Sequence, residues 1–277
     1  MDISLHSVEG RHWAALPGAP SAISGLSLSA VRGEQIAVIG PSGAGKTTLL
    51  QMLALALKPA SGHLTLDGEN PWMLATSRLQ KLRGQILYAP QTPPLPPRQR
   101  VVTSLLAGRL PALSLMQSLL QLIYPSNLDQ AVTALSAFDL SEKLWERVDR
   151  LSGGERQRVG LARALMSPAE CWLIDEPLSA LDPTRAKLAM DTLVSEARRR
   201  NVTLIVTLHQ VDVATSRFPR VIGLRDGKCA FDLPAAHVTR TLLGELYAQH
   251  EHELADVAAP QFDLPAEPAQ AKIVHCR

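Results

Sequence analysis

Short apolar runs along the chain alternate with longer segments that have the spacing of helices. Each run is apolar on both faces, which is typical of a strand buried within a sheet. Helices are predicted at Lys46–Leu57, which Pro59 closes, and through residues 184–200. The predicted strands are Gln35–Ile39, Gln85–Tyr88, Cys171–Asp175 and Val202–Thr207. Buried strands that alternate with helices predict an α/β fold with a mostly parallel sheet.

A smaller antiparallel β part is predicted near the N-terminus. His63–Leu66 alternates between polar and apolar residues and ends at Asp67-Gly68, which is a turn signal. This combination predicts a small antiparallel hairpin beside the parallel core.

A helical pattern without strand signals occupies the middle of the chain. It runs from Val101 to about Ser152, with breaks at Pro111 and Pro125. We therefore expect an α-helical subdomain inserted into the core. The expected divisions are about residues 1–90 and 158–247 for the core, and about residues 91–157 for the helical subdomain.

The composition changes after about Tyr247. Pro260, Pro265 and Pro268 interrupt this last segment, which has no sustained periodicity. We expect residues 248–277 to form a loosely ordered tail.

Composition narrows the classes of function. With 46% hydrophobic residues in a length of 277, the chain can bury a sizeable core. A net charge of +2 and an aromatic content of 4% argue against nucleic-acid binding. The three cysteines have no disulfide or metal-site spacing, which favours a reducing compartment. The apolar stretch Ala112–Ile123 is too short to span a bilayer, so a membrane role requires a partner that spans it.

The segment from Gly40 to Thr47 matches the phosphate-loop pattern G-x-x-x-x-G-K-[ST] between a predicted strand and a predicted helix. Its glycines allow backbone N–H groups to wrap phosphates at the positive end of the helix. Lys46 is expected to hold the β- and γ-phosphates, and the Thr47 hydroxyl to bind Mg²⁺. The expected nucleotide-binding residues here are Gly40, Pro41, Ser42, Gly43, Ala44, Gly45, Lys46, Thr47 and Thr48.

Two carboxylates stand at the end of the predicted strand Cys171–Asp175, after the apolar residues Trp172, Leu173 and Ile174. Asp175 ends this strand, where an acid beside a phosphate loop is placed to meet the metal ion. Glu176 is one residue further on and is expected to align and deprotonate an attacking water. Together with the phosphate loop, the pair predicts nucleotide hydrolysis.

The sequence LSGGERQR at Leu151–Arg158 is the signature of ATP-binding-cassette (ABC) ATPases, and the chain resembles this family over about residues 3–247. The resemblance implies one ABC ATPase domain over residues 1–247. It also implies the RecA-like fold of P-loop NTPases, with ATP and Mg²⁺ as cofactors.

The resemblance implies roles for four further residues. Trp13 lies where the family has an aromatic residue, usually Tyr, that stacks on adenine. Gln91 lies where the Q-loop glutamine contacts the metal ion and the attacking water. Asp182 lies in a segment similar to the D-loop, which crosses to the second subunit. His209 resembles the switch histidine that contacts the γ-phosphate.

The signature residues Ser152, Gly153 and Gly154 precede a helix predicted at Glu155–Met166, so they offer a second set of N–H groups for a γ-phosphate. In the family, two cassettes pair head to tail and enclose two ATP molecules. One cassette per chain therefore implies a homodimer that closes on ATP and opens after hydrolysis.

Three classes of cassette protein compete at this point: transporter ATPases, mechanical ATPases of repair or translation, and accessory subunits of soluble enzyme complexes. The chain has no long heptad pattern and one cassette, which favours a transporter. The segments Met190–Leu193, Val206–Asp212 and Ala107–Leu110 are similar to the ATPase subunit of phosphonate importers. An accessory subunit of a carbon–phosphorus lyase complex remains the alternative.

The transporter resemblance also implies partners and a location. The ATPase is expected at the cytoplasmic face of the inner membrane, peripherally bound to a separate integral permease. Through the permease it would serve a periplasmic or surface substrate-binding protein.

A proline run, Pro93-Pro94-Leu95-Pro96-Pro97, follows Gln91 where the subgroup usually has an aromatic and polar stretch. This region lines the groove for the permease's coupling helix in the family. Because proline fixes φ, we interpret the run as a stiffened strut between the ATP site and the membrane partner.

Overall fold

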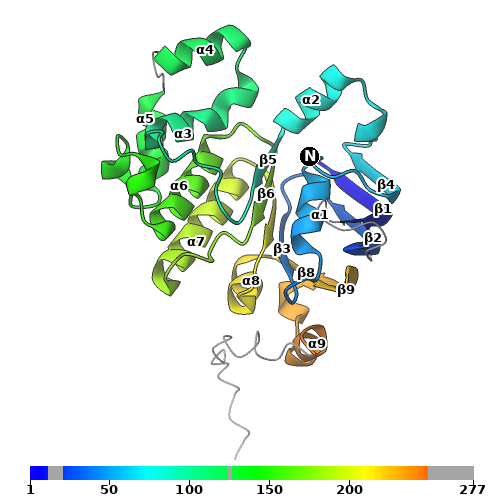
Figure 1. Ribbon diagram of the computed structural model, residues 1–277. Coiled ribbons are helices and arrows are strands. Elements are labelled where there is room, and N and C mark those ends of the chain that lie inside the picture. Colours follow the sequence, from blue (N-terminus) through cyan, green and yellow to red (C-terminus); the bar gives the residue numbers. More distant parts are fainter. Residues whose placement is uncertain (12–20, 124–126, 249–277) are drawn as a thin grey trace, which may run out of the picture.

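Some of the features expected from the sequence fall outside the residues that the structure describes. Trp13, Pro125 and residues 249–277 of the expected tail lie outside it. The structure is a computed structural model that describes residues 1–11, 21–123 and 127–248 (Figure 1).

The larger sheet confirms the expected mostly parallel α/β core. Within the described ranges it has six strands in the order β5-β6-β7-β3-β8-β9, all parallel except the antiparallel pair β8 and β9. The four predicted strands are present, two of them shifted or shortened by one residue, whereas β8 and β9 were not predicted. The bounds are β3 (Gln35–Ile39), β5 (Ile86–Ala89), β6 (Cys171–Asp175), β7 (Thr203–Thr207), β8 (Arg220–Arg225) and β9 (Lys228–Pro234).

A second sheet confirms the small antiparallel part. It consists of β1 (Ile3–Gly10), β2 (Ile23–Ala30) and β4 (Ser61–Leu66), with β1 in the middle. The predicted hairpin forms only as the antiparallel bridge between Leu66 and Glu69, whereas β4 itself pairs with β1. The turn at Asp67-Gly68 does form, and both residues have positive φ, but it leads into the short 3₁₀ helix η1 (Pro71–Met73).

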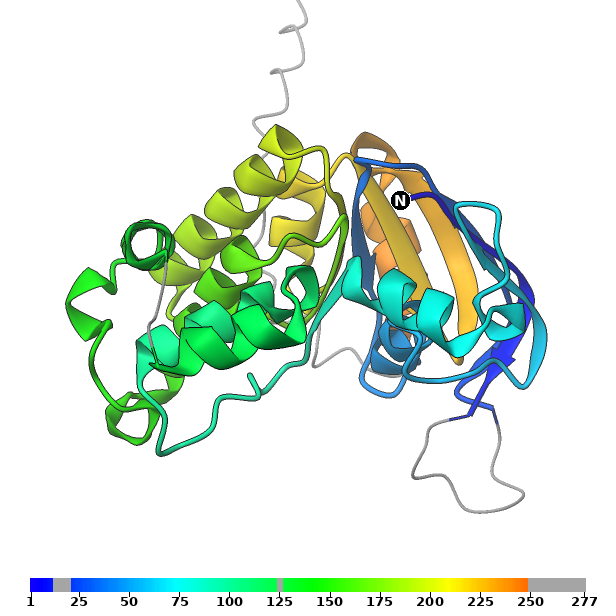
Figure 2. The ribbon, with the colours of Figure 1, turned by 90° about the horizontal axis from the view of Figure 1, so that it is seen from above.

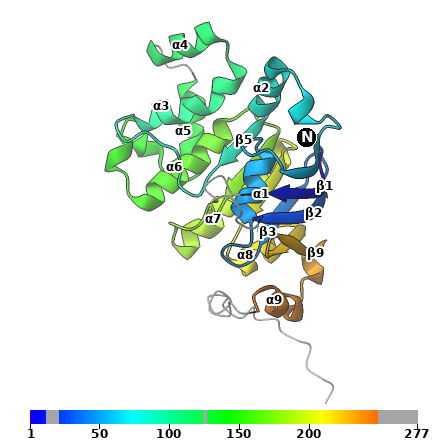
Figure 3. The ribbon, with the colours of Figure 1, turned by 45° about the vertical axis from the view of Figure 1, so that its right-hand side comes forward.

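The helices surround the larger sheet, as Figures 1 and 3 show. The first helix is shorter than predicted: it ends at Leu53 with Ala54 as its C-cap, and the chain then leaves the helix at Leu55, which has a φ of +56°. The helix bounds are α1 (Lys46–Leu53), α2 (Thr76–Gly84), α3 (Val101–Leu106), α4 (Leu115–Ile123), α5 (Leu128–Ser136), α6 (Gly153–Met166), α7 (Pro183–Arg199), α8 (Val211–Arg217) and α9 (Arg240–Leu246).

The helical segment from α3 to α6 lies on one side of the central sheet, and the antiparallel sheet lies on the other (Figure 2). Pro111 falls inside the 3₁₀ helix η2 (Ala107–Ala112), which follows α3. The expected division between residues 157 and 158 falls inside α6. Two short 3₁₀ helices, η3 (Ser141–Lys143) and η4 (Val148–Arg150), lie between α5 and α6. A third, η5 (Ala235–His237), lies between β9 and α9.

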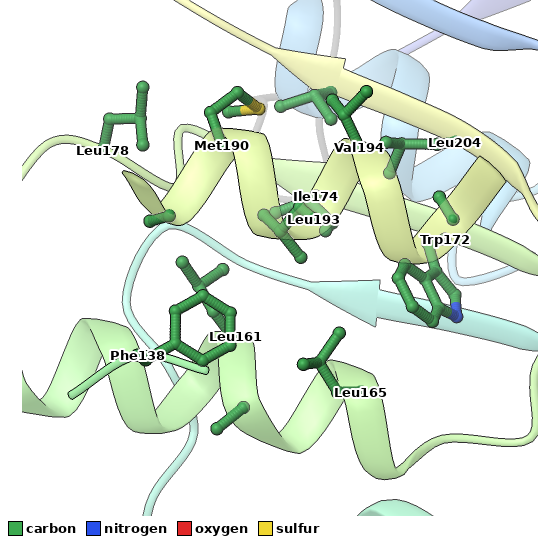
Figure 4. Close-up of a cluster of buried hydrophobic side chains, with 14 of the residues drawn as sticks. Phe138, Leu161, Leu165, Trp172, Ile174, Leu178, Met190, Leu193, Val194 and Leu204 are labelled. Carbon is green, nitrogen blue, oxygen red and sulfur yellow. The ribbon is translucent and has the colours of Figure 1, made fainter. Parts of the chain in front are cut away.

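The sheet separates two hydrophobic cores. Along β6, Trp172 and Ile174 pack into the core shared with α6 and α7 (Figure 4). Leu173, between them, packs into the core on the side of α1. Every residue of β3, β6 and β7 is buried, as expected for parallel strands covered on both faces.

In the part of the chain that the structure describes, no helix combines the length and apolarity needed to cross a bilayer.

Candidate ATP-binding and hydrolysis site

The phosphate loop connects β3 to α1, as the sequence predicts. Gly43 and Gly45 have φ values of +82° and +99°, which favour glycine, and Gly45 is the N-cap of α1. A Cβ on Gly45 would lie 2.4 Å from the carbonyl oxygen of Ala22, so no side chain fits there. The loop therefore exposes its backbone at the N-terminus of a helix, where phosphate groups bind.

Lys46 begins α1 and is buried, with 5% of its surface exposed. Its Nζ donates hydrogen bonds to the carbonyl oxygens of Gly40 at 2.7 Å and Pro41 at 3.2 Å. These contacts hold the ammonium group over the loop, where it can meet the phosphates of a nucleotide. Thr48 is also buried and packs in the first turn of the helix.

Asp175 lies at the end of β6 and is 3% exposed. Burial raises the pKa of its carboxyl above the ordinary value, although hydrogen bonds with Thr207 and Thr47 and the charge of Lys46 act in the opposite direction. Because Thr47 and Asp175 meet, one hydroxyl and one carboxylate oxygen are available to a hard cation. The donor set fits Mg²⁺, whose charge would favour the ionised carboxylate.

Glu176 follows Asp175 in a left-handed conformation with a φ of +45°, which costs backbone energy in a residue other than glycine. Its Oε2 accepts a hydrogen bond from Nε2 of Gln91 at 2.7 Å, and its Oε1 lies 2.5 Å from Nε2 of His209. Burial alone would raise the pKa of Glu176, but the hydrogen bond and charge of His209 and the charge of Lys46 hold it below its ordinary value. The carboxylate is therefore ionised and oriented near neutral pH.

These contacts bring together residues that are far apart in the sequence. Gln91 follows β5, Glu176 follows β6 and His209 follows β7. Because the three strands are parallel neighbours, their carboxyl ends meet at one edge of the sheet beside the phosphate loop.

The signature segment occupies the start of α6. Ser152 is the N-cap and forms a capping box with Glu155: its hydroxyl accepts the Glu155 N–H at 3.2 Å, and its N–H donates to Oε2 of Glu155 at 2.8 Å. The helix begins at Gly153, two residues before the predicted start. Gly154 packs closely on the next motif, since a Cβ there would lie 2.9 Å from the carbonyl oxygen of Ala180.

Asp182 is the N-cap of α7, where its Oδ1 accepts a hydrogen bond from the Arg185 N–H at 3.1 Å. The D-loop residues before it therefore enter α7 through a fixed turn. The close approach of Gly154 to Ala180 places the signature and the D-loop side by side in one chain.

The proline run is packed against the signature helix. Leu95 is 8% exposed and belongs to the core that contains α6. Pro93 lies on Gly160, and Nη1 of Arg163 donates a weak hydrogen bond to the Pro94 carbonyl at 3.5 Å. The run thus connects the residue after β5 to the helix that carries the signature.

Gly160→Ala is expected to displace the proline run. The added Cβ would lie 2.7 Å from Cγ and 2.8 Å from Cβ of Pro93, and a proline ring has little freedom to move aside. The free energy of unfolding should fall by about 1–3 kcal/mol, which chemical denaturation measures. Gly244→Ala in α9 is the matched control, because a Cβ there meets no described heavy atom within 4 Å. An equal effect of both substitutions would contradict the contact.

Sequence reasoning did not identify Thr207 at this site. Its hydroxyl donates to Oδ1 of Asp175 at 2.6 Å and accepts the Glu176 N–H at 2.9 Å. The sequence did carry one signal for it: Thr207 is a polar residue at the end of the predicted strand Val202–Thr207.

Comparison with known proteins gives the class of the molecule. The ABC transporter family model matches residues 23–179. An ATP-binding cassette solved as a dimer in a post-hydrolysis state with ADP and Pi has a TM-score of 0.72 and 26% identity, and the match covers 84% of this chain and 98% of that one. The chain belongs to the ABC transporter family, and the expected P-loop NTPase fold is confirmed.

Relatives that match over the full length of both chains narrow the class of protein further. The chain is 60% identical to the phosphonates import ATP-binding protein PhnC of Polaromonas sp. (strain JS666), with 100% of both chains covered. It is 57% identical to the phosphonates import ATP-binding protein PhnC 2 of Albidiferax ferrireducens, again over 100% of both chains. The expected similarity to phosphonate-importer ATPases is confirmed.

Proposed function

We propose that the chain is the ATP-hydrolysing subunit of an ABC importer for phosphonate or a related phosphorus oxyanion. The observation that supports the ATPase activity is the position of Glu176, whose carboxylate is oriented by Gln91 and His209 beside the phosphate loop. The proposed substrate class comes from the full-length similarity to two phosphonates import ATP-binding proteins.

The phosphate loop and its neighbours bind the nucleotide. The backbone of the loop and the ammonium group of Lys46 hold the phosphates of ATP, and Trp13 stacks on adenine. Thr47, Asp175 and Gln91 would hold Mg²⁺, which neutralises charge on the phosphates when it is bound. All three side chains are close to the loop or to Glu176, which supports this assignment.

Glu176 acts as the general base. Its ionised carboxylate accepts a proton from the water that attacks the γ-phosphorus, while Gln91 orients that water. His209 contacts the γ-phosphate and holds the carboxylate of Glu176 in place. The contacts of Glu176 with both residues support a base whose carboxylate is held in a fixed direction.

A second copy of the chain completes the site. In the homodimer, Ser152, Gly153 and Gly154 of one subunit face the γ-phosphate held by the other, and Asp182 lies at the crossing between them. The capping box at Ser152 supports this assignment, because it fixes a helix N-terminus toward which an anion is attracted.

The partner in the membrane is an integral permease, which connects the ATPase to a periplasmic or surface substrate-binding protein. The ATPase binds it from the cytoplasmic face. Support for a protein contact comes from α4, where Leu115, Met116 and Leu119 are 79%, 67% and 52% exposed.

Uptake of a radiolabelled phosphonate by cells tests the function. Deletion of the gene should abolish uptake, and the wild-type chain should restore it whereas Glu176→Gln should not. Normal uptake with failed cleavage of the carbon–phosphorus bond would instead indicate an accessory subunit of a lyase complex. Normal uptake and cleavage would contradict both.

A further inference from the structure

Thr207 is the last residue of β7 and is fully buried, with 0% of its surface exposed. In the parallel register it lies opposite Asp175, the last residue of β6. Its hydroxyl is within hydrogen-bond distance of both acidic residues: it is 2.6 Å from Oδ1 of Asp175 and 2.9 Å from the backbone nitrogen of Glu176. One side chain thus connects the two carboxylate positions.

The chemistry of the groups determines the direction of both bonds. A hydroxyl has one donor and two acceptor lone pairs, whereas a backbone N–H can only donate. Thr207 must therefore accept from Glu176, which leaves its hydrogen for the carboxylate of Asp175. A hydrogen bond to an ionised carboxylate is stronger than one between neutral groups.

The bond to Glu176 also supports a strained backbone. Glu176 has a φ of +45°, and its N–H is shared between Oγ1 of Thr207 at 2.9 Å and the carbonyl oxygen of Thr207 at 3.2 Å. Such a conformation persists when surrounding contacts over-determine it. The same backbone conformation directs the Glu176 side chain toward Gln91 and His209.

We propose that Thr207 is a positioning residue for ATP hydrolysis: its hydroxyl fixes Asp175 on the metal side and Glu176 on the water side in one arrangement. The proposal rests on the proposed roles of Asp175 and Glu176. Thr207 is fully buried and its hydroxyl bonds to both acidic residues, so its effect passes through Asp175 and Glu176.

Thr203 provides a matched control in the same strand. It is also 0% exposed, and its hydroxyl donates to the Met1 carbonyl at 2.9 Å and accepts the Gly33 N–H at 3.1 Å. It begins β7, at the end of the strand away from the acidic pair. Thr203→Val therefore removes a buried hydroxyl with two hydrogen bonds without touching the proposed site.

The test compares Thr207→Val, Thr207→Ser and Thr203→Val with the wild-type chain. Thr207→Val should lower kcat about 10-fold to 100-fold, because hydrogen bonds with charged groups are lost, and should change the KM for ATP little. Thr207→Ser keeps the hydroxyl and should restore kcat to within about threefold of wild type. Thr203→Val should lower the melting temperature but leave kcat within about twofold.

A second readout does not depend on turnover. Calorimetric titration of ATP at increasing Mg²⁺ should show a severalfold higher half-saturating Mg²⁺ concentration for Thr207→Val, but not for Thr203→Val. If Thr207→Val does not fold, Thr207→Cys replaces it, since a thiol is a weak donor; its kcat should lie clearly below that of Thr207→Ser.

Wild-type kcat and Mg²⁺ dependence in Thr207→Val, or equal losses in Thr203→Val, would overturn the proposal. Glu176→Gln is measured in parallel to separate this failure from failure of the site assignment. If Glu176→Gln loses hydrolysis while Thr207→Val does not, the positioning role is wrong and the base assignment stands. If Glu176→Gln hydrolyses ATP normally, the site assignment itself is wrong.

Discussion

Glu176→Gln is expected to stop ATP hydrolysis while ATP binding continues. The substitution keeps the shape of the side chain and one oxygen, but it removes the carboxylate that accepts the proton of the attacking water. Loss of a general base lowers turnover by about 10²–10⁴-fold. The steady-state rate of phosphate release by the purified chain measures this loss.

Glu170→Gln is the matched control for this substitution. Glu170 directly precedes β6, whereas Glu176 directly follows it, and the Glu170 carboxylate pairs with Arg32 at the surface. An exposed ion pair contributes little to stability, about 0–1 kcal/mol, so turnover should remain near that of the wild-type chain. Near-normal hydrolysis by Glu176→Gln would contradict the assignment of the base.

Lys46→Ala is expected to weaken ATP binding and thereby abolish hydrolysis at ordinary ATP concentrations. The ammonium group is buried and held by the carbonyl oxygens of Gly40 and Pro41, so it is ready to bind phosphate oxygens. Hydrogen bonds with charged groups contribute about 1.5–3 kcal/mol, which corresponds to about 10-fold to 150-fold weaker binding. Calorimetric titration of ATP measures the change.

Lys58→Ala controls for the loss of a positive charge near α1. Lys58 is exposed in the segment after that helix and has no part in the phosphate loop. ATP affinity should be unchanged in this variant. Equal weakening by Lys46→Ala and Lys58→Ala would show that only net charge matters and would contradict the specific role of Lys46.

The site could be largely predicted because its residues occupy strand ends. Asp175 ends the buried strand β6 and Glu176 directly follows it, and the phosphate loop follows the buried strand β3. Strands with this pattern are parallel and buried, so their carboxyl ends meet without further information. The sequence motifs then identify which side chains are brought together there.

Contacts that depend on register could not be predicted in the same way. The hydroxyl of Thr207 meets Asp175 because the two residues are opposite each other in neighbouring strands, and strand neighbours are not encoded by spacing. The same holds for β1, whose pairing with β2 shifts in register after Leu5 and after Val8. Ser7, at the first shift, has a positive φ. These irregularities disturb the alternation of polar and apolar residues by which a half-buried strand is predicted.

The proline run shows how packing changes an interpretation. Its composition predicts stiffness, but the composition does not show that Leu95 enters the core or that Pro93 lies on Gly160. A glycine within a helix is unfavourable by about 1 kcal/mol relative to alanine, and here it makes room for the proline ring. The strut remains a hypothesis, now with a defined attachment to α6.

A site shared by two copies predicts a change in mass when ATP binds. Glu176→Gln retains ATP, so light scattering after size exclusion in ATP and Mg²⁺ should give twice the 30.0 kDa of one chain. Without nucleotide, the same variant should elute at the mass of one chain. A mass of one chain with ATP bound would contradict the shared site.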